Sequence, residues 1–364
     1  MDLKLRILLL LLTAFLIPSE AHRESVNGPR DVLCNYLEDD RGYVCELTNL
    51  KLYSEDDNLR FTGIQKPGKF NEDVSVLHIH SSEVHVVPSE NIFNYFTNLV
   101  KLVMKGVSVM TVSQIVNCAA LDLIDLSNNV ILTLEAGIFI ECVALETLDL
   151  KTNKISKIHD NAFSSLKQLT SLDLSFNQIE KITRKMIKPM TKLKKLSLQS
   201  NKLKELAHDT FNDMIDLVEL DLSRNPLTRL DFRFFDYTMH IETLRLQGTH
   251  IKKFHPFTFK NLRRLRFLDL SDNDLKFVDN DLLSTNGELV ELTMDQVGLK
   301  SIGRQFFDKL NKLKFFSAAN NKCVSGQFRG DVVEIRPNFF KCMEAWDDIK
   351  DKVAEGRTHP GDEL

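Results

Sequence analysis

The feature that most constrains the fold is a pattern of apolar residues that returns every 24 positions. The segments LETLDLKTNKI, LTSLDLSFNQI and LKKLSLQSNKL begin at Leu145, Leu169 and Leu193, and the spacing continues unchanged to Leu313. The pattern extends back to Leu121 and, more loosely, to Leu99 and Val74, which makes about eleven units. A fixed period of this length indicates a solenoid, because each unit can bury its apolar side only against its neighbours.

The consensus LxxLxLxxNxL predicts the local structure of each unit. Alternating apolar residues such as Leu148 and Leu150 point to one side of a short strand, and the residues between them point to the other side. Ile158 and Phe163, in the return segment, should fill the rest of the core. The pattern is that of the 24-residue leucine-rich repeat of extracellular proteins. We therefore predict an α/β repeat solenoid, a leucine-rich-repeat horseshoe with a parallel β-sheet on its concave side.

An asparagine recurs where each predicted strand turns into a loop. A buried amide at this place can bond the backbone groups that the turn leaves unpaired, so we interpret the column as structural. Other residues interrupt it at Ser82, Val107, Thr249 and Val297, where we expect looser turns. The column consists of Asn129, Asn153, Asn177, Asn201, Asn225, Asn273 and Asn321.

The two ends of the chain differ from the repeats. Lys4 and Arg6 precede a short apolar run, and Ser19-Glu20-Ala21 follows it, which is the layout of a secretory signal peptide. We predict a signal peptide over 1–21, an N-terminal cap over 22–73, repeats over 74–321, a C-terminal cap over 322–342 and an acidic tail over 343–364.

Because exported proteins fold in an oxidising compartment, we interpret the six cysteines as disulfide-bonded. Several connectivities are open to six cysteines, but their grouping favours three local pairs. Cys118 and Cys142 occupy the same column on adjacent units, and the other two pairs would clip the caps. The predicted pairs are Cys34–Cys45, Cys118–Cys142 and Cys323–Cys342.

Two resemblances to known families extend this prediction. The repeats resemble those of Toll-type ectodomains and Slit-type proteins. The segment around Cys34 and Tyr43-Val44-Cys45, with the NEDVSVLHIHSSEVHVVPSENIFNYFTNLVKL stretch after it, is similar to secreted insect leucine-rich-repeat proteins, including the leucine-rich immune proteins of mosquitoes. These resemblances imply an extracellular role, and the second implies innate immunity.

The long mosquito proteins dimerise through a C-terminal coiled coil and cysteine cluster. This chain shows neither after Cys342, so we expect a short form that is a monomer or a weak dimer.

The outward side chains of the strands are the candidate binding surface. Most strands carry an aspartate at the same position, which is either bonded to nearby hydroxyls or part of an acidic strip that awaits a basic partner. We expect Arg245 to be paired laterally with Asp221 and Asp269. Phe176, Phe267 and Phe315 lie on or beside this face and are either interface anchors or packed against neighbours. For residues 145–288 the predicted partner-binding residues are Asp149, Asp173, Phe176, Gln199, Arg224, Arg245, Arg266, Phe267 and Asp269.

Other classes of function find little support in the sequence. We find no nucleophile elbow, HExxH, P-loop or GxGxxG motif, so we expect neither an enzyme nor a cofactor. His78 and His80 share a face, but Lys101, Val103 and Lys105 on the next strand cannot complete a zinc site, and we expect no metal. The mildly basic middle of the chain is unlike a nucleic-acid binder, and no segment after the signal peptide is long enough to span a membrane.

The sequence leaves three functions open. The first is extracellular recognition of a protein ligand on the concave face, in innate immunity. The second is an adhesion, matrix or developmental-signalling ligand on the same scaffold. The third is a binding protein resident in the endoplasmic reticulum, because the chain ends Gly361-Asp362-Glu363-Leu364, which resembles a retrieval signal with its first residue changed.

Overall fold

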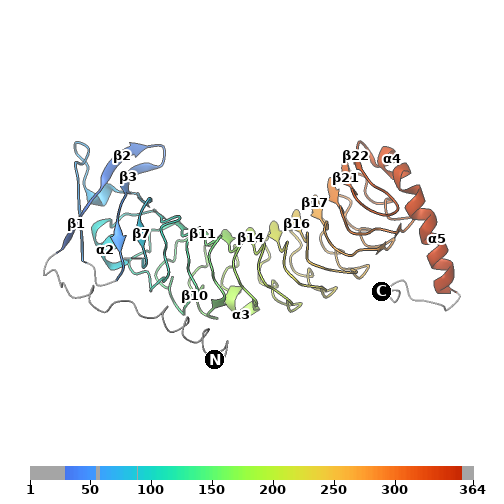
Figure 1. The fold of residues 1–364 in the computed structure, drawn as a ribbon, viewed down its shortest axis with the longest axis horizontal. Helices are drawn as coiled ribbons and strands as arrows, with labels where there is room; N and C mark the ends of the chain where they lie inside the picture. Colours follow the sequence, from blue (N-terminus) through green and yellow to red (C-terminus); the bar gives the residue numbers. More distant parts are fainter. Residues whose placement is uncertain (1–28, 55–57, 88, 355–364) are drawn as a thin grey trace, which may run out of the picture.

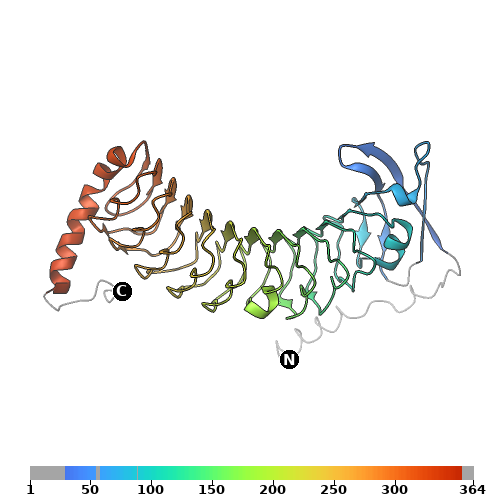
Figure 2. The same ribbon diagram turned by 180° about the vertical axis from the view of Figure 1, so that it is seen from behind.

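The computed structural model describes residues 29–54, 58–87 and 89–354. The predicted signal peptide and the C-terminal tetrapeptide lie outside the described residues. The chain forms a curved solenoid whose strands line the concave side and whose return segments form the convex side (Figure 1). Seen from behind, each turn of the chain is a separate coil stacked on the next (Figure 2).

One sheet of 14 strands runs the length of the arc. Each predicted unit from Val74 to Leu313 contributes one strand, β6 to β21, and strands from the two caps extend the sheet at both ends. In spatial order its strands are β2 (Asn35–Asp39), β3 (Gly42–Leu47), β6 (Val76–Ile79), β8 (Lys101–Val103), β9 (Leu123–Asp125), β11 (Thr147–Asp149), β13 (Ser171–Asp173), β14 (Lys195–Ser197), β15 (Glu219–Asp221), β16 (Thr243–Arg245), β17 (Phe267–Asp269), β19 (Glu291–Thr293), β21 (Phe315–Ser317) and β22 (Gln327–Arg329).

The register of the sheet repeats the sequence period without a slip. Leu148 of β11 pairs with Leu172 of β13, and every further pairing up to β21 is parallel with the same offset. Both leucines are buried, whereas the residues on either side of them remain partly exposed. The structure therefore confirms the predicted parallel sheet with one side in the core.

The convex return segments are mostly successive turns. In the unit that begins at Leu145, the amide of Leu166 donates to the carbonyl of Phe163 at 3.1 Å, and both side chains are fully buried. Only two short helices lie on this side, so the helical part of the predicted α/β class is small among the described residues. They are α2 (Ser89–Tyr95) and α3 (Arg184–Ile187); short parallel pairs are β1 (Arg30–Leu33) with β5 (Leu59–Thr62), β4 (Lys51–Leu52) with β7 (Glu83–Val84), β10 (Thr133–Leu134) with β12 (Lys157–Ile158), and β18 (Phe277–Val278) with β20 (Ser301–Ile302).

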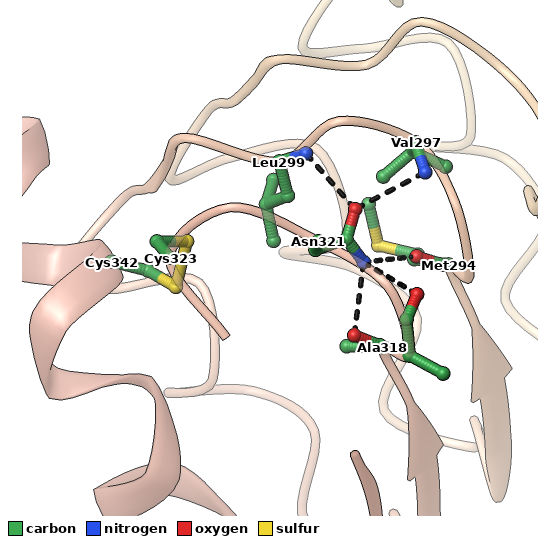
Figure 3. The surroundings of a disulfide bond; sticks show 8 residues. Met294, Val297, Leu299, Ala318, Asn321, Cys323 and Cys342 are labelled. Atoms are coloured by element: carbon green, nitrogen blue, oxygen red, sulfur yellow. Dashed lines mark hydrogen bonds between the residues drawn. A yellow bond between two sulfur atoms is a disulfide. The ribbon is translucent and has the colours of Figure 1, made fainter. Parts of the chain in front are cut away.

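The asparagine column joins successive turns beneath the ends of the strands. The Asn201 amide nitrogen donates to the carbonyls of Leu174 and Leu198 at 2.9 and 3.0 Å, and its oxygen accepts from the amide of Ile179 at 3.0 Å. Asn321 makes the same kind of contact at the last turn (Figure 3). These side chains satisfy backbone groups of two turns at once, which is the structural role predicted for the column.

The N-terminal cap is part of the sheet. Strands β2 and β3 form an antiparallel hairpin, and β3 then pairs in parallel with β6, with Cys45 beside Leu77. The 3₁₀ helix Asn71–Asp73 lies just before β6. The regular sheet thus begins inside the segment that we assigned to the cap, because Val44 and Cys45 are fully buried and continue the repeat core.

The C-terminal cap is a helix laid against the last turn. Strand β22 pairs antiparallel with β21, and α4 (Val332–Ile335), a 3₁₀ helix (Arg336–Phe339) and α5 (Phe340–Ala354) follow. Phe339 stacks on the core residue Phe316 with ring centroids 4.6 Å apart. Helix α5 continues past residue 342, where we set the end of the cap, because Met343 is also buried against the core.

Three disulfides hold the chain together. They join Cys34 to Cys45, Cys118 to Cys142 and Cys323 to Cys342, the same pairs that the grouping of the cysteines favours. The Cα atoms of Cys118 and Cys142 lie 4.7 Å apart, so this bond links two adjacent turns. The third bond ties α5 to the loop after the last asparagine of the column (Figure 3).

Candidate binding face

The concave face consists of three rows of side chains, of which the first two point outward and the third is buried wherever it holds a serine. The first row contains the first residue of each strand, such as Thr147 and Ser171. The second row lies two residues later, at Asp149 and Asp173, and the third row two residues later again. Because the strands are in register, neighbours in a row come from adjacent strands, roughly 4.8 Å apart.

The aspartates of the second row shape the turn that follows each strand. The Asp173 Oδ1 atom accepts from the backbone amide of Ser175 at 2.9 Å and from its hydroxyl at 2.6 Å. Asp149, Asp221 and Asp269 accept from the amide two residues on in the same way. This local bonding favours the first of our two interpretations, in which the aspartates recur for structural reasons.

Asp149 is the most perturbed carboxylate of the second row. Burial raises its pKa, and the negative charge of Asp125 on the neighbouring strand adds to this effect. The amide and the ammonium group of Lys151 act in the opposite direction, and the ammonium lies 3.0 Å from the carboxylate. Burial is therefore the main cause of the raised pKa of Asp149, and the charge of Asp125 is a smaller one.

Arg245 differs from our expectation of lateral pairing. It is exposed in the second row between Asp221 and Asp269, yet it forms no ion pair or side-chain hydrogen bond among the described residues. The Oδ1 atom of Asp269 instead accepts from the amide of Ser271 and from the Thr293 hydroxyl, at 2.9 and 2.6 Å. The guanidinium group of Arg245 is therefore available to a partner.

A shallow hollow of about 210 Å³ lies over the middle of the concave face. It is centred where Ser197 interrupts the second row, because a serine there leaves space between Asp173 and Asp221. An ion pair between Lys195 and Glu219, 2.8 Å long, borders it. The lining residues are Ser171, Leu172, Asp173, Lys195, Leu196, Ser197, Glu219, Asp221 and Arg245.

A second feature is a ridge of left-handed residues just beyond the strand ends. Phe176 and Arg224 both have φ near +55°, a conformation that bulky side chains rarely adopt. Phe176 is nevertheless 47% exposed, so core packing does not explain a phenylalanine there. The ridge consists of Asn128, Thr152, Phe176, Ser200, Arg224, Gly248, Asp272, Gln296 and Asn320.

The predicted site residues lie on one side of the molecule but not in one cluster. Asp149, Asp173, Gln199, Arg245, Phe267 and Asp269 belong to the three rows. Phe176 and Arg224 stand on the ridge after the strands, whereas Arg266 precedes its strand at the opposite edge. Sequence reasoning missed the hollow, although its signal was visible: Ser197 and Arg245 are the two residues that interrupt the aspartates between Asp125 and Asp269.

The two histidines lie near the N-terminal end of the same face. Their rings are 4.8 Å apart, and the His78 Nδ1 atom lies 3.8 Å from the Glu46 carboxylate. Burial lowers the pKa of His78, and the neighbouring His80 lowers it further. Glu46 comes from β3, a neighbouring strand that the repeat pattern alone did not place beside the histidines.

Comparison with known proteins identifies the repeat. The family model for the leucine rich repeat matches residues 119–179, 191–238 and 239–299. These segments of the chain are leucine-rich repeats. No curated protein sequence matches the chain closely enough to count as a relative. Among the described residues, no helix is long and apolar enough to cross a membrane.

Solved leucine-rich-repeat structures share the fold. A chain of the Toll–Spatzle complex of Drosophila superposes with a TM-score of 0.58 at 19% identity, over 77% of this chain and 42% of that one. TLR13, in complex with ssRNA13, gives 0.54 at 21%, over 69% and 47%. An LRR protein of Leptospira interrogans gives 0.60 at 20%, over 78% and 80%. The chain thus spans less than half the length of the first two, and the likeness at this identity is one of fold.

Proposed function

We propose that this leucine-rich-repeat solenoid is an extracellular recognition scaffold that binds a protein partner on its concave face, between residues 145 and 288. The observation that carries the proposal is the set of side chains that the fold does not use. Arg245 has no internal partner within the described residues, Phe176 is held exposed in an unfavourable backbone conformation, and Phe267 is 41% exposed. Exposed aromatic and arginine side chains are the usual anchors of protein interfaces.

The shape and charge of the face support the same function. The hollow over Ser197 has negative charge from Asp173 and Asp221 and positive charge from Arg245 at its border. Mixed charge around apolar anchors suits specific protein recognition better than a surface of one sign. The face is open and shallow, which suits a partner surface better than a small substrate that must be shielded from water. A binding role therefore fits this face better than an enzymatic one.

The setting that we propose is the extracellular space, as a monomer or weak dimer, in innate immunity. Three disulfides suit an oxidising compartment. Recognition in immunity rests on the resemblance to Toll-type ectodomains, one of which is solved in a complex with Spatzle. Induction of the protein by infection would support this setting, and constitutive, tissue-patterned expression would favour an adhesion or developmental ligand. Secretion that rises when residues 361–364 are deleted would favour the endoplasmic reticulum.

The test of the proposal is capture followed by substitution. The purified chain is used to capture partners from the native fluid, and Phe267→Ala with Arg245→Ala is compared with the parent. We expect an unchanged thermal midpoint and binding weaker by at least ~1–2 kcal/mol, because neither side chain belongs to the core. A double variant that binds the captured partner like the parent would exclude the central concave face.

A further inference from the structure

The first row of the concave face changes character toward its C-terminal end. From β11 to β16 it holds small or charged side chains, such as Thr147 and Lys195. On the next three strands it holds Phe267, Glu291 and Phe315. These three residues are in register on β17, β19 and β21, with Glu291 in the middle. A carboxylate thus stands between two phenylalanines on one exposed sheet face.

The core has no need of this aromatic pair. Leu268, Leu292 and Phe316 alternate with the three residues along the strands and are the ones that are buried. The two phenylalanines remain partly open to solvent. Since neighbouring strands lie roughly 4.8 Å apart, the two phenyl groups start about 10 Å from each other on either side of Glu291.

Glu291 differs from the other acids around it because nothing in the described part of the protein uses its charge. Its carboxylate forms no ion pair or hydrogen bond within the residues that the structure describes. By contrast, Glu219 in the same row pairs with Lys195 at 2.8 Å. Asp295, at the end of the same turn, accepts from the Ser317 hydroxyl at 2.6 Å. Glu291 is therefore a negative charge that no other described residue pairs with, and it lies between two phenylalanines.

One arginine of the chain already contacts one of the two rings. The guanidinium carbon of Arg329 lies 4.5 Å from the centroid of the Phe315 ring. Arg329 comes from β22, which pairs with β21 on the side away from Glu291. Phe315 thus has a cation beside it on β22, at the end of the sheet. On its other side, on β19, its neighbour in the row is the carboxylate of Glu291.

We propose that Phe267, Glu291 and Phe315 bind a lysine or arginine side chain of the protein partner. The ring faces attract a cation through their quadrupoles, and the carboxylate adds a charge-assisted hydrogen bond. This inference rests on the proposed function and deepens it, because it states the chemistry that the partner presents at the C-terminal end of the concave face. It also extends the site beyond residue 288, where the predicted surface ended.

The test uses the full chain and a defined probe. The probe is the capped peptide Gly-Gly-Arg-Gly-Gly, and its neutral counterpart carries citrulline in place of arginine. Both are titrated into protein with isotope-labelled phenylalanine, and the ring signals of Phe267 are assigned with the Phe267→Leu variant. We expect the arginine peptide to shift the Phe267 signals and the citrulline peptide to leave them in place. Equal shifts from both peptides would overturn the proposal.

The matched pair of variants is Glu291→Gln and Glu219→Gln. Both remove one carboxylate from the first row without touching the core, but only Glu291 lies between aromatic rings. We expect Glu291→Gln to weaken binding of the arginine peptide about fivefold, from the loss of an exposed ion pair. Glu219→Gln should bind it like the parent. If Glu291→Gln also binds like the parent, the carboxylate plays no part and the proposal is wrong.

This experiment separates the inference from the proposed function. A captured partner that binds Glu291→Gln as tightly as the parent would leave concave-face recognition intact and overturn the basic-side-chain site. A captured partner that binds Arg245→Ala as the parent does, but binds Glu291→Gln more weakly, would support the site and move the main interface toward β17–β22.

Discussion

The core side and the concave side of the sheet share the same strands and the same 24-residue period, yet they repeat differently. On the core side, the middle residue of each strand from β11 to β19 is a buried leucine, and the asparagine column below is nearly as regular. On the concave side, aspartates recur in the second row, where they bond the following turn, and serines recur in the third row. The first row has no repeat at all.

This difference shows which positions packing dictates. A side chain that must fill a gap between two identical turns meets the same surroundings in each unit, so the same residue recurs. Packing does not constrain the residue type of a side chain that faces solvent, so the residue there can be one that binds a partner. The irregular positions of a regular solenoid, such as Ser197 and Glu291, are therefore where recognition is to be sought.

The largest expected difference in the free energy of unfolding is between substitutions of two adjacent residues of β16. Leu244→Ala should reduce the free energy of unfolding by about 2–5 kcal/mol, because it opens a cavity in a fully buried part of the core. Arg245→Ala should change it by no more than about 0.5 kcal/mol. Chemical denaturation of both variants measures this. Similar losses would show that the concave side also contributes to stability, and the contrast between the core side and the concave side would be wrong.

A smaller loss should come from the asparagine column. Asn201→Ala leaves the amide of Ile179 without its partner and removes one of the two side-chain donors to each of the carbonyls of Leu174 and Leu198, so we expect about 2 kcal/mol of destabilisation. Gln199→Ala, two residues earlier in the third row, is the control and should have little effect. Equal stability of the parent and Asn201→Ala would mean that water replaces the amide.

On the left-handed ridge, a substitution should raise the free energy of unfolding instead of lowering it. Phe176→Asn should stabilise the protein by about 0.5–1 kcal/mol, because asparagine adopts positive φ more easily than phenylalanine. The same change should weaken binding of the captured partner. Thermal melting and a binding titration give the two readouts. A variant that loses stability would show that Phe176 packs on its neighbours rather than waiting for a partner.

The smallest expected effect concerns Asp149 and its pH dependence. Burial raises the pKa of Asp149, so the folded state holds this proton more tightly than the unfolded state, and ionisation of the group reduces stability as pH rises through that range. The Asp149→Asn variant keeps a side-chain oxygen that can accept from the amide of Lys151. The variant should be slightly more stable than the parent at pH 7, within about 0.5 kcal/mol. Denaturation at several pH values measures this advantage. It should vanish below the ordinary aspartate pKa of about 3.9, and an advantage that persists there would contradict the electrostatic cause.

The sequence by itself determined the repeating part of this protein. The period, the parallel sheet, the buried leucines and the asparagine column all follow from local patterns, because each turn contacts only its neighbours and nearby residues decide its structure. The grouping of the cysteines pointed to three local pairs for a similar reason: two pairs lie within the caps, and the third spans one period.

Only the tertiary structure decided how the ends and the outward side chains are used. The N-terminal hairpin joins the sheet, and α5 covers the last turn, through contacts that no repeat pattern encodes. Arg245 was expected to be paired because two aspartates flank it, but the Oδ1 atom of each aspartate accepts from a turn amide, and that of Asp269 also accepts from a hydroxyl. Which charges are paired depends on side-chain directions in three dimensions. Arg245 and Glu291, which have no partner in the described part of the chain, could therefore be found only after the strands were placed side by side.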